Sequence, residues 1–267
     1  MPYIPTNSIN LATTSIKPVI RLGLQGASGS GKTFSALTFP NPVVLDFDNG
    51  CQRHAGRDIT VIPFYNDKWC VEVLKCQIVK GQVEGVPATV VNKRDAFKKW
   101  LNEEGQKLLA DQTLILDSFT TLSMNFDSVT DLQPSYSKDG SVDAFAFWSR
   151  KLDFTKDILQ TLIGLNCHVV VCFHETCMRD PASGLLLEKV APLSQGKSVA
   201  IIPLFFSDFF RQLAVDRKIK GPDGKEVVTG TDYLWQVKSS SQCNCKTRMK
   251  LKDGTTNIPA NFESFTY

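Results

Sequence analysis

The chain has 267 residues, of which 42% are hydrophobic and 21% are charged, and its formal net charge is +3. This composition is typical of one large α/β domain, and we expect no second full domain. The small net charge does not by itself indicate a nucleic-acid partner. The longest apolar runs, 168–173 and 199–206, are too short to span a bilayer, and the first residues lack the order of a signal peptide, so we expect a soluble, cytoplasmic protein with no membrane partner.

The first 17 residues are rich in Pro, Thr and Ser and show little periodicity, which predicts an extended N-terminal arm over 1–17. From residue 18 onward, strand-like and helix-like segments alternate. This order predicts a single domain over 18–267, built as a mostly parallel sheet flanked by helices. The last part, about 199–267, is richer in strand patterns and predicts β hairpins, one of which turns at 221–224.

The segment after the first predicted strand, 22–25, matches the phosphate-binding pattern G-x-x-x-x-G-K-[ST]. A loop that wraps a polyphosphate points its backbone N–H groups inward, and glycines allow the close approach. Lys32 is expected to reach the β- and γ-phosphates and the Thr33 hydroxyl to bind Mg²⁺, before a short helix over 33–37. The expected nucleotide contacts are Gly26, Ala27, Ser28, Gly29, Ser30, Gly31, Lys32, Thr33 and Phe34.

The second predicted strand, 42–48, ends with two carboxylates, and either Asp46 or Asp48 could orient an attacking water molecule as general base. Helices are predicted over 67–76 and 94–110, with a loop at 80–87 between them. The two carboxylates are therefore expected at the edge of the sheet where open α/β sheets bind their ligands.

A second nucleotide signature is the apolar strand 113–118, which delivers Asp117 near its C-terminal end. Downstream of a P-loop, such an aspartate is the expected Walker B residue, which holds the Mg²⁺ ion that Thr33 also touches. After a helix over 144–162, the strand 167–173 is followed directly by His174, which is expected next to the γ-phosphate. The alternative for His174 is a hydrogen bond that only closes the strand end.

Eight cysteines in a chain of this size indicate a reducing compartment, and several fall inside predicted buried strands, so we expect small core residues. The close pair Cys243 and Cys245 lacks two further ligands at the spacing that zinc needs. Between Arg211 and Lys252 there are ten lysines and arginines against four acidic residues. This local excess either contacts phosphate or lies on a solvated hairpin.

Five segments together resemble the RecA-like ATP-binding proteins of bacteriophages, some of which anneal or assist single-stranded DNA. They are 26–33, 44–50, 115–118, 170–175 and 192–197, and the resemblance extends over about 15–265. It implies a RecA-like P-loop core that binds ATP and Mg²⁺ and hydrolyses ATP weakly, with stimulation by single-stranded DNA, in recombination or annealing. It also implies a homo-oligomer, either ring or filament, with a single-strand binding protein as a further partner.

The resemblance also assigns roles to individual residues. In RecA-type ATPases an acidic residue after the second strand activates water, and Asp48 occupies that position with a side chain shorter than the usual glutamate; Asp46 is the fallback. His174 resembles the polar sensor that couples the γ-phosphate to a DNA-binding loop. Lys246 and Arg248 resemble the K-x-R pair that these ATPases insert into the nucleotide site of the neighbouring subunit.

Two loops are candidates for DNA contact. The first, 176–197, follows the sensor position and carries cations that can pair with phosphates. The second, 133–141, lies between the Walker B strand and the helix over 144–162, and its tyrosine could stack on a base. The candidate DNA-binding residues are Arg179, Lys189, Lys197, Tyr136 and Lys138.

Two other functions remain compatible with the same residues. A P-loop kinase for a small metabolite would use Asp46 or Asp48 to hold the acceptor hydroxyl, and it would need an arginine-bearing lid over the γ-phosphate. A nucleotide-binding module with little hydrolysis would act only as a loading or interaction partner. The sequence favours the ATPase, because the late cations suit an intersubunit finger better than a lid.

Overall fold

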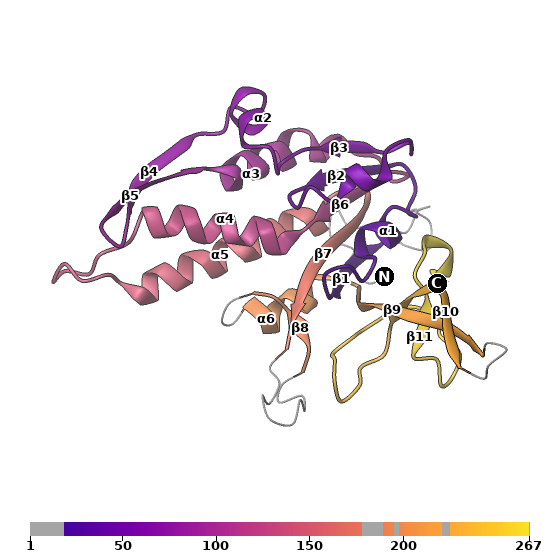
Figure 1. The fold of residues 1–267 in the computed structure, drawn as a ribbon. Coiled ribbons are helices and arrows are strands. Elements are labelled where there is room, and N and C mark those ends of the chain that lie inside the picture. The colour runs from indigo at the N-terminus through magenta and orange to yellow at the C-terminus, as the bar shows by residue number, and fades with distance from the viewer. Residues whose placement is uncertain (1–18, 178–188, 195–197, 221–224, 267) are drawn as a thin grey trace, which may run out of the picture.

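The structure is a computed structural model, and it describes residues 19–177, 189–194, 198–220 and 225–266. Strands and helices alternate along most of the chain before a long β hairpin follows (Figure 1). The expected N-terminal arm and the expected hairpin turn at 221–224 lie outside the described residues.

The elements are as follows. The strands are β1 (Arg21–Gly26), β2 (Pro42–Asp46), β3 (Thr60–Ile62), β4 (Ile78–Val83), β5 (Val86–Val91), β6 (Thr113–Asp117), β7 (His168–Thr176), β8 (Ala191–Pro192), β9 (Asp208–Lys220), β10 (Glu226–Gln236) and β11 (Asn257–Pro259). The helices are α1 (Lys32–Ala36), α2 (Asp67–Glu72), α3 (Lys93–Glu103), α4 (Phe119–Leu132), α5 (Ala144–Ile163) and α6 (Ser198–Ile201). Short 3₁₀ turns are η1 (Cys51–His54), η2 (Gly105–Lys107), η3 (Ile202–Phe205) and η4 (Phe262–Ser264).

The central sheet has the strand order β11-β10-β9-β1-β7-β6-β2-β3, and β8 pairs with the end of β7. From β9 through β3 every neighbouring pair in this order is parallel, so the C-terminal ends of these strands meet at one edge. β10 and β11 extend the sheet in antiparallel fashion. The predicted fold class, an α/β fold with a mostly parallel sheet, flanking helices and a hairpin toward the C-terminus, is confirmed.

Both faces of the sheet are buried, which explains why its inner strands are nearly continuous apolar runs. Helices α3, α4 and α5 cover one face with side chains such as Phe97, Phe119 and Leu159. The other face is covered by α1 and by segments that follow β9, and it includes the buried Trp235. Six of the cysteines are buried, among them Cys172 in β7, as expected for small core residues.

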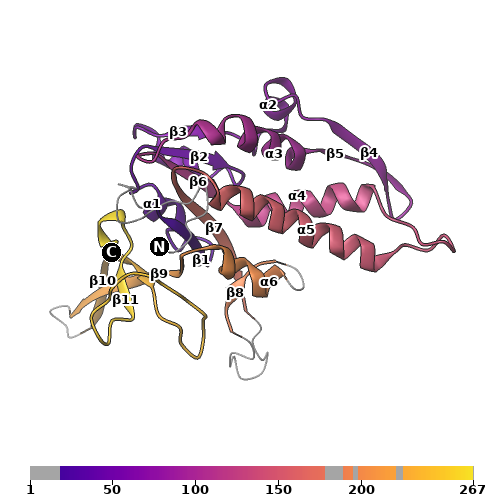
Figure 2. The ribbon, with the colours of Figure 1, turned by 180° about the vertical axis from the view of Figure 1, so that it is seen from behind.

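Helices α4 and α5 lie side by side and project beyond the sheet together with the β4–β5 hairpin (Figures 1 and 2). The prediction of a loop at 80–87 is therefore wrong. The two strands pair around Glu84 and Gly85, which have φ values of 52° and 79° and form a two-residue turn. The hairpin is stable because it packs on α4, where Val79 contacts Val129 and Leu132. A glycine and a proline interrupt its sequence pattern, so tertiary packing decides its structure.

Several predicted helices exist but are shorter than expected. The helix predicted over 94–110 ends at Glu103, two residues before Gly105, and the helix predicted over 67–76 ends at Glu72. Both begin at asparagine caps, Asn92 and Asn66, whose side chains accept a backbone N–H of the first turn. In the part of the chain that the structure describes, no helix has the length and apolar character to cross a membrane.

Candidate nucleotide site

The expected nucleotide-site residues gather at the edge formed by the C-terminal ends of the parallel strands. β7 lies between β1 and β6, and Gly26 at the end of β1 pairs in register with His174. On the other side of β6, Asp46 at the end of β2 pairs in register with Asp117. Strand order thus brings the P-loop, the Walker B aspartate and the histidine together from distant parts of the chain.

The P-loop has the backbone that its glycines were expected to provide. Gly29 and Gly31 have φ values of 76° and 89°, a region that side chains disfavour. A Cβ on Gly26 would lie 2.6 Å from the Ser30 Oγ atom, so a glycine is required there as well. The Ser30 hydroxyl is buried and has no hydrogen-bond partner among the described residues, as expected for a group that a phosphate oxygen would satisfy.

Lys32 lies inside the loop rather than in solvent. Its side chain is 6% exposed, and its ammonium donates to the carbonyl oxygens of Gly26 and Ala27 at 2.9 Å each. A buried ammonium held only by neutral carbonyls is a strong site for an anion, because low dielectric strengthens the attraction to phosphate.

The residues expected to hold Mg²⁺ lie close enough to do so. The Thr33 Oγ1 atom donates to the Asp117 Oδ2 atom at 2.7 Å. A Cβ on Gly50 would lie 3.6 Å from Asp117 Oδ2 and 3.9 Å from Thr33 Oγ1, so the absent side chain leaves space beside the two oxygens. A hydroxyl and a carboxylate facing a space without side chains fit Mg²⁺, which keeps several waters and takes few protein ligands.

The raised pKa of Asp117 also favours a metal site at this edge. Its pKa is raised to about 6, chiefly by burial and also by the nearby carboxylates of Asp48 and Asp46, against the lowering effect of the hydrogen bond from Thr33. Three carboxylates that meet at one edge repel one another. A divalent cation would relieve this repulsion.

Asp48 lies at the same edge, and its carboxylate contacts side chains of neighbouring elements. His174 Nε2 is 3.0 Å from its Oδ2 atom, and Thr121 on α4 donates to its Oδ1 atom. Burial raises the pKa of Asp48, but hydrogen bonds from His174, Thr121 and Ser118 outweigh burial and hold the pKa below the usual value. The side chain of Asp48 is 22% exposed and that of His174 is 31% exposed, so both remain open to a ligand.

Asp46, the alternative base, has a different role. Its side chain is fully buried, and its two oxygens accept the backbone N–H groups of Asp48, Gly50 and Cys51. A carboxylate that accepts three backbone N–H groups holds the turn after β2 in place, and its burial keeps it from solvent. These contacts favour Asp48 over Asp46 as the general base.

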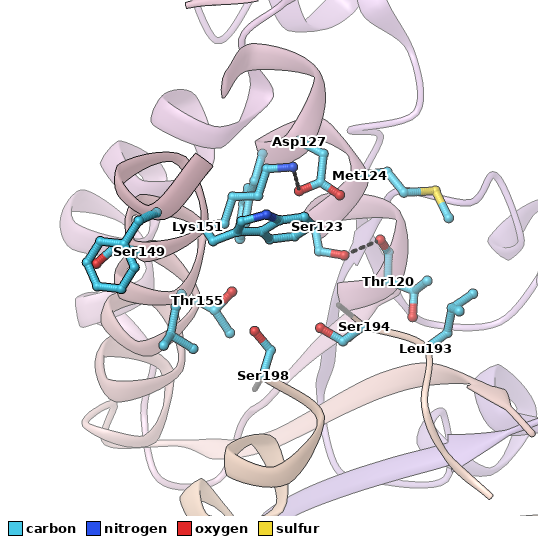
Figure 3. A pocket seen from close by; sticks show the side chains of 14 residues that line it. Thr120, Ser123, Met124, Asp127, Ser149, Lys151, Thr155, Leu193, Ser194 and Ser198 are labelled. Atoms are coloured by element: carbon cyan, nitrogen blue, oxygen red, sulfur yellow. Dashed lines mark hydrogen bonds and ion pairs between the residues drawn. The ribbon is translucent and has the colours of Figure 1, made fainter. Parts of the chain in front are cut away.

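The backbone at His174 links the nucleotide edge to a groove beside it. Its N–H donates to the Thr120 Oγ1 atom at 3.0 Å, and its carbonyl accepts the N–H of Leu193 at 2.6 Å. Thr120 and Leu193 both line a groove of about 550 Å³. In Figure 3, side chains of α4 and α5 face Leu193, Ser194 and Ser198 across this groove.

The groove carries exposed aromatic groups that the sequence pattern did not single out. Phe145 is 84% exposed and Trp148 is 48% exposed, both on α5. The Lys151 ammonium lies 4.9 Å from the Trp148 ring centroid and 3.0 Å from Asp127 Oδ1, so its charge is already paired. The groove is therefore largely apolar, with aromatic faces and hydroxyl groups.

The candidate DNA-binding residues are dispersed. Tyr136 and Lys138 lie in the connection between α4 and α5 (Figure 1). Asp117 precedes the first turn of α4, and a helix of 14 residues is roughly 20 Å long, so this connection is far from Asp117. Lys189 is exposed, and its ammonium donates to Asn244 Oδ1 at 2.9 Å. Arg179 and Lys197 lie outside the described residues.

Lys246 and Arg248 do not reach the P-loop of their own chain. The backbone of Lys246 pairs with Phe209, which lies beside Gly23 in the sheet, three residues before the P-loop. That separation is about 10 Å along the strands. Arg248 is exposed, and its backbone N–H donates to Asp208 Oδ1.

Three other cations of the basic segment are paired with carboxylates. Arg211 makes a two-fold ion pair with Glu175, with both distances at 2.9 Å. Arg217 pairs with Asp232 and Lys218 with Glu226, across the β9–β10 hairpin. Of the two interpretations of this segment, the balanced hairpin face fits these residues better than a free phosphate-binding surface.

These features define a P-loop nucleotide-binding protein with a mostly parallel α/β sheet. A family model described as AAA domain, AAA_24, matches residues 19–203, more than half of the chain. The chain therefore belongs to this family, and residues 19–203 form an AAA-type P-loop ATPase domain.

The chain also has similarity to solved structures. It is similar to the RadB recombinase, with 11% identity, a TM-score of 0.34, and coverage of 85% of this chain and 91% of that one. It is also similar to the flagellar accessory protein FlaH from Methanocaldococcus jannaschii, with 11% identity, a TM-score of 0.32, and coverage of 82% and 78%. No curated protein matches the sequence.

Proposed function

We propose that this protein is a Mg²⁺-dependent ATPase whose turnover is coupled to single-stranded DNA, as a recombination or annealing factor of the kind that bacteriophages encode. The observation that carries the proposal is the meeting of two side-chain pairs at one sheet edge, Thr33 with Asp117 and Asp48 with His174. The first pair suits a metal and the second suits the activation of water, and both lie beside the P-loop.

Each residue of the edge has a distinct part in hydrolysis. The loop 26–33 cradles the phosphates, and Lys32 exchanges its two carbonyl partners for phosphate oxygens. Thr33 and Asp117 hold Mg²⁺, which when bound neutralises charge that develops on the phosphates. Asp48 orients the attacking water and accepts its proton, and its lowered pKa keeps it ionised at neutral pH.

Coupling to DNA is supported by the backbone contacts of His174. A small shift of His174 on loss of the γ-phosphate would move Thr120 and Leu193, which line the groove. Exposed aromatic side chains there, Trp148 above all, are suited to stacking on unpaired bases. We propose Tyr136 and the lysines and arginine of the two loops as further contacts to the strand: Lys138, Arg179, Lys189 and Lys197.

A homo-oligomeric ring or filament is part of the proposal. Lys246 and Arg248 lie away from the P-loop of their own chain, and this placement suits an arginine finger that acts in the site of a neighbouring copy. Such a protein would have weak activity as a monomer. It would work in the cytoplasm, alongside a single-strand binding protein.

The test is ATP hydrolysis with and without single-stranded DNA over a series of protein concentrations. We expect DNA to stimulate turnover, a steep dependence on protein concentration, and complete loss in Lys32→Ala. Trp148→Ala should lose DNA stimulation but keep basal turnover, whereas the control Leu109→Ala, at an exposed residue outside the groove, should behave as wild type. Turnover that needs Lys32 but ignores both DNA and concentration would contradict the proposal and favour a small-molecule kinase. ATP binding without turnover would favour a binding module.

A further inference from the structure

An exposed aromatic ring lies directly beside the phosphate loop. Phe34 follows Thr33 on α1, and it is 42% exposed although it is a large apolar side chain. Successive residues of a helix point about 100° apart, so Phe34 faces away from Thr33 and from the Asp117 side of the site. Thr33 marks the end where the γ-phosphate and Mg²⁺ belong. The nucleoside lies at the opposite end of the phosphate chain from the γ-phosphate, so a bound nucleotide directs it away from Thr33, and Phe34 is an exposed ring on such a side.

A second ring, from a residue 199 positions further along the chain, meets Phe34 there. Tyr233 on β10 lies 5.4 Å from Phe34 between ring centroids, at an interplanar angle of 37°. It also packs on the P-loop itself, because a Cβ on Gly31 would lie 2.5 Å from two atoms of the Tyr233 ring. The two rings therefore form an aromatic wall, Phe34 and Tyr233, that begins at the phosphate loop.

The segment that contains η1 also lies beside the aromatic wall. The Arg57 guanidinium lies 5.4 Å from the centroid of the Phe34 ring, and the His54 ring lies 6.5 Å from it. Burial lowers the pKa of His54, and the charges of Arg57 and Arg53 lower it further, so its ring is neutral at neutral pH. Arg57 is exposed and can move aside or lie on the face of an entering ring.

We propose that the aromatic wall is the nucleobase site of this protein and that it recognises a purine by stacking. This inference rests on the proposed function only in that the P-loop must bind a nucleotide. Stacking recognises the face of a base, and purines offer the larger face, so a purine triphosphate binds more tightly than a pyrimidine triphosphate. The wall determines base preference without taking part in phosphate chemistry.

The test compares three ligands that share the phosphate chain: Mg·ATP, Mg·CTP and Mg·tripolyphosphate, each titrated calorimetrically in the absence of DNA. Tyr233→Ala should weaken ATP binding roughly 5- to 100-fold, as expected for loss of one stacked ring, and CTP binding less. Tripolyphosphate affinity should be unchanged. Tyr233→Phe keeps the ring and should bind all three ligands as wild type, as should the control Leu109→Ala, which removes an exposed apolar side chain outside the aromatic wall.

Because Tyr233 also packs on Gly31, a second variant guards against damage to the loop. Phe34→Ala removes an exposed ring without opening that contact, and it should lower ATP affinity selectively as well. Equal weakening of ATP and tripolyphosphate in both variants would overturn the proposal and leave the rings a structural role. Unchanged ATP affinity in both variants would overturn it too. If the wild-type protein binds none of the three ligands, the proposed nucleotide-binding function itself is contradicted.

Discussion

His174 Nε2 lies 3.0 Å from Asp48 Oδ2, although the two residues are 126 positions apart in the chain. The contact spans the sheet edge from the end of β7 to the turn after β2, with β6 between them. The contact therefore links Asp48, the proposed general base, to His174. The backbone N–H of His174 in turn donates to Thr120, which lines the neighbouring groove. Under the proposed function, a change at the γ-phosphate would reach that groove through this contact.

The role of Asp48 is tested by removing its charge. Asp48→Asn should lower kcat for ATP hydrolysis by about 10²- to 10⁴-fold, the range typical for loss of a general base, while ATP affinity changes little. The amide still accepts from Thr121, so the turn is expected to survive. Single-turnover kinetics beside a binding titration separate the two quantities. A variant with wild-type turnover would show that another group activates water.

Asp46 provides the matched comparison, because it lies two residues away and has no catalytic part in this arrangement. Asp46→Asn loses charged hydrogen bonds to backbone N–H groups of the turn, each worth about 1.5–3 kcal/mol. We expect a lower free energy of unfolding, measured by urea denaturation, together with weaker Mg·ATP binding. Unchanged stability with a selective loss of kcat would instead restore Asp46 as the base.

The fall in kcat at low pH reports the pKa of Asp48, so its position tests whether His174 lowers that pKa. Burial alone would raise that pKa, and the hydrogen bonds from His174, Thr121 and Ser118 bring it below the usual value. His174→Ala should therefore raise the pKa of Asp48 and move the acid limb of kcat to higher pH. His174→Gln keeps a hydrogen-bond donor and should reverse part of this shift. If neither variant moves the limb, the contact does not set the protonation of Asp48.

The local parts of the site could be predicted from sequence, because each depends on a short run of residues. The P-loop is a contiguous pattern whose glycines, lysine and threonine have fixed roles, and Asp117 ends an apolar strand. The sequence does not predict the pairing of Asp48 with His174, since that contact depends on the order in which strands enter the sheet. Periodicity within one strand contains no information about its neighbours.

Other parts of the site gave no local signal. Thr121 and Thr120 lie in the first turn of α4, where hydroxyl residues are common and need no functional reason. Gly50 looks like an ordinary turn residue until its position beside Thr33 and Asp117 is known. Tyr233 alternates within β10 as any strand tyrosine does, and only the tertiary fold places it on the P-loop.

The raised pKa of Asp117 gives a prediction about stability without metal. Burial and the nearby carboxylates raise this pKa from 3.8 to about 6 in the folded protein. The folded state thus binds a proton more tightly than the unfolded state, and the resulting stability is fully present below about pH 4 and lost as pH rises through about 6. At pH 7.5 the ionised carboxylate destabilises the metal-free protein, by at most about 3 kcal/mol for a shift of this size.

Asp117→Asn removes that ionisation while keeping an oxygen that can accept from Thr33. Without Mg²⁺ the variant should exceed the wild type in free energy of unfolding by about 1–3 kcal/mol at pH 7.5, and the difference should vanish near pH 4. Saturating Mg·ATP should reverse the order at pH 7.5, because only the wild type keeps the carboxylate that binds the metal. Urea denaturation of both proteins at the two pH values, with and without Mg·ATP, measures the difference in free energy of unfolding under each of the four conditions. A variant that is less stable than the wild type under metal-free conditions at pH 7.5 would show that the carboxylates at this edge do not repel one another enough to matter.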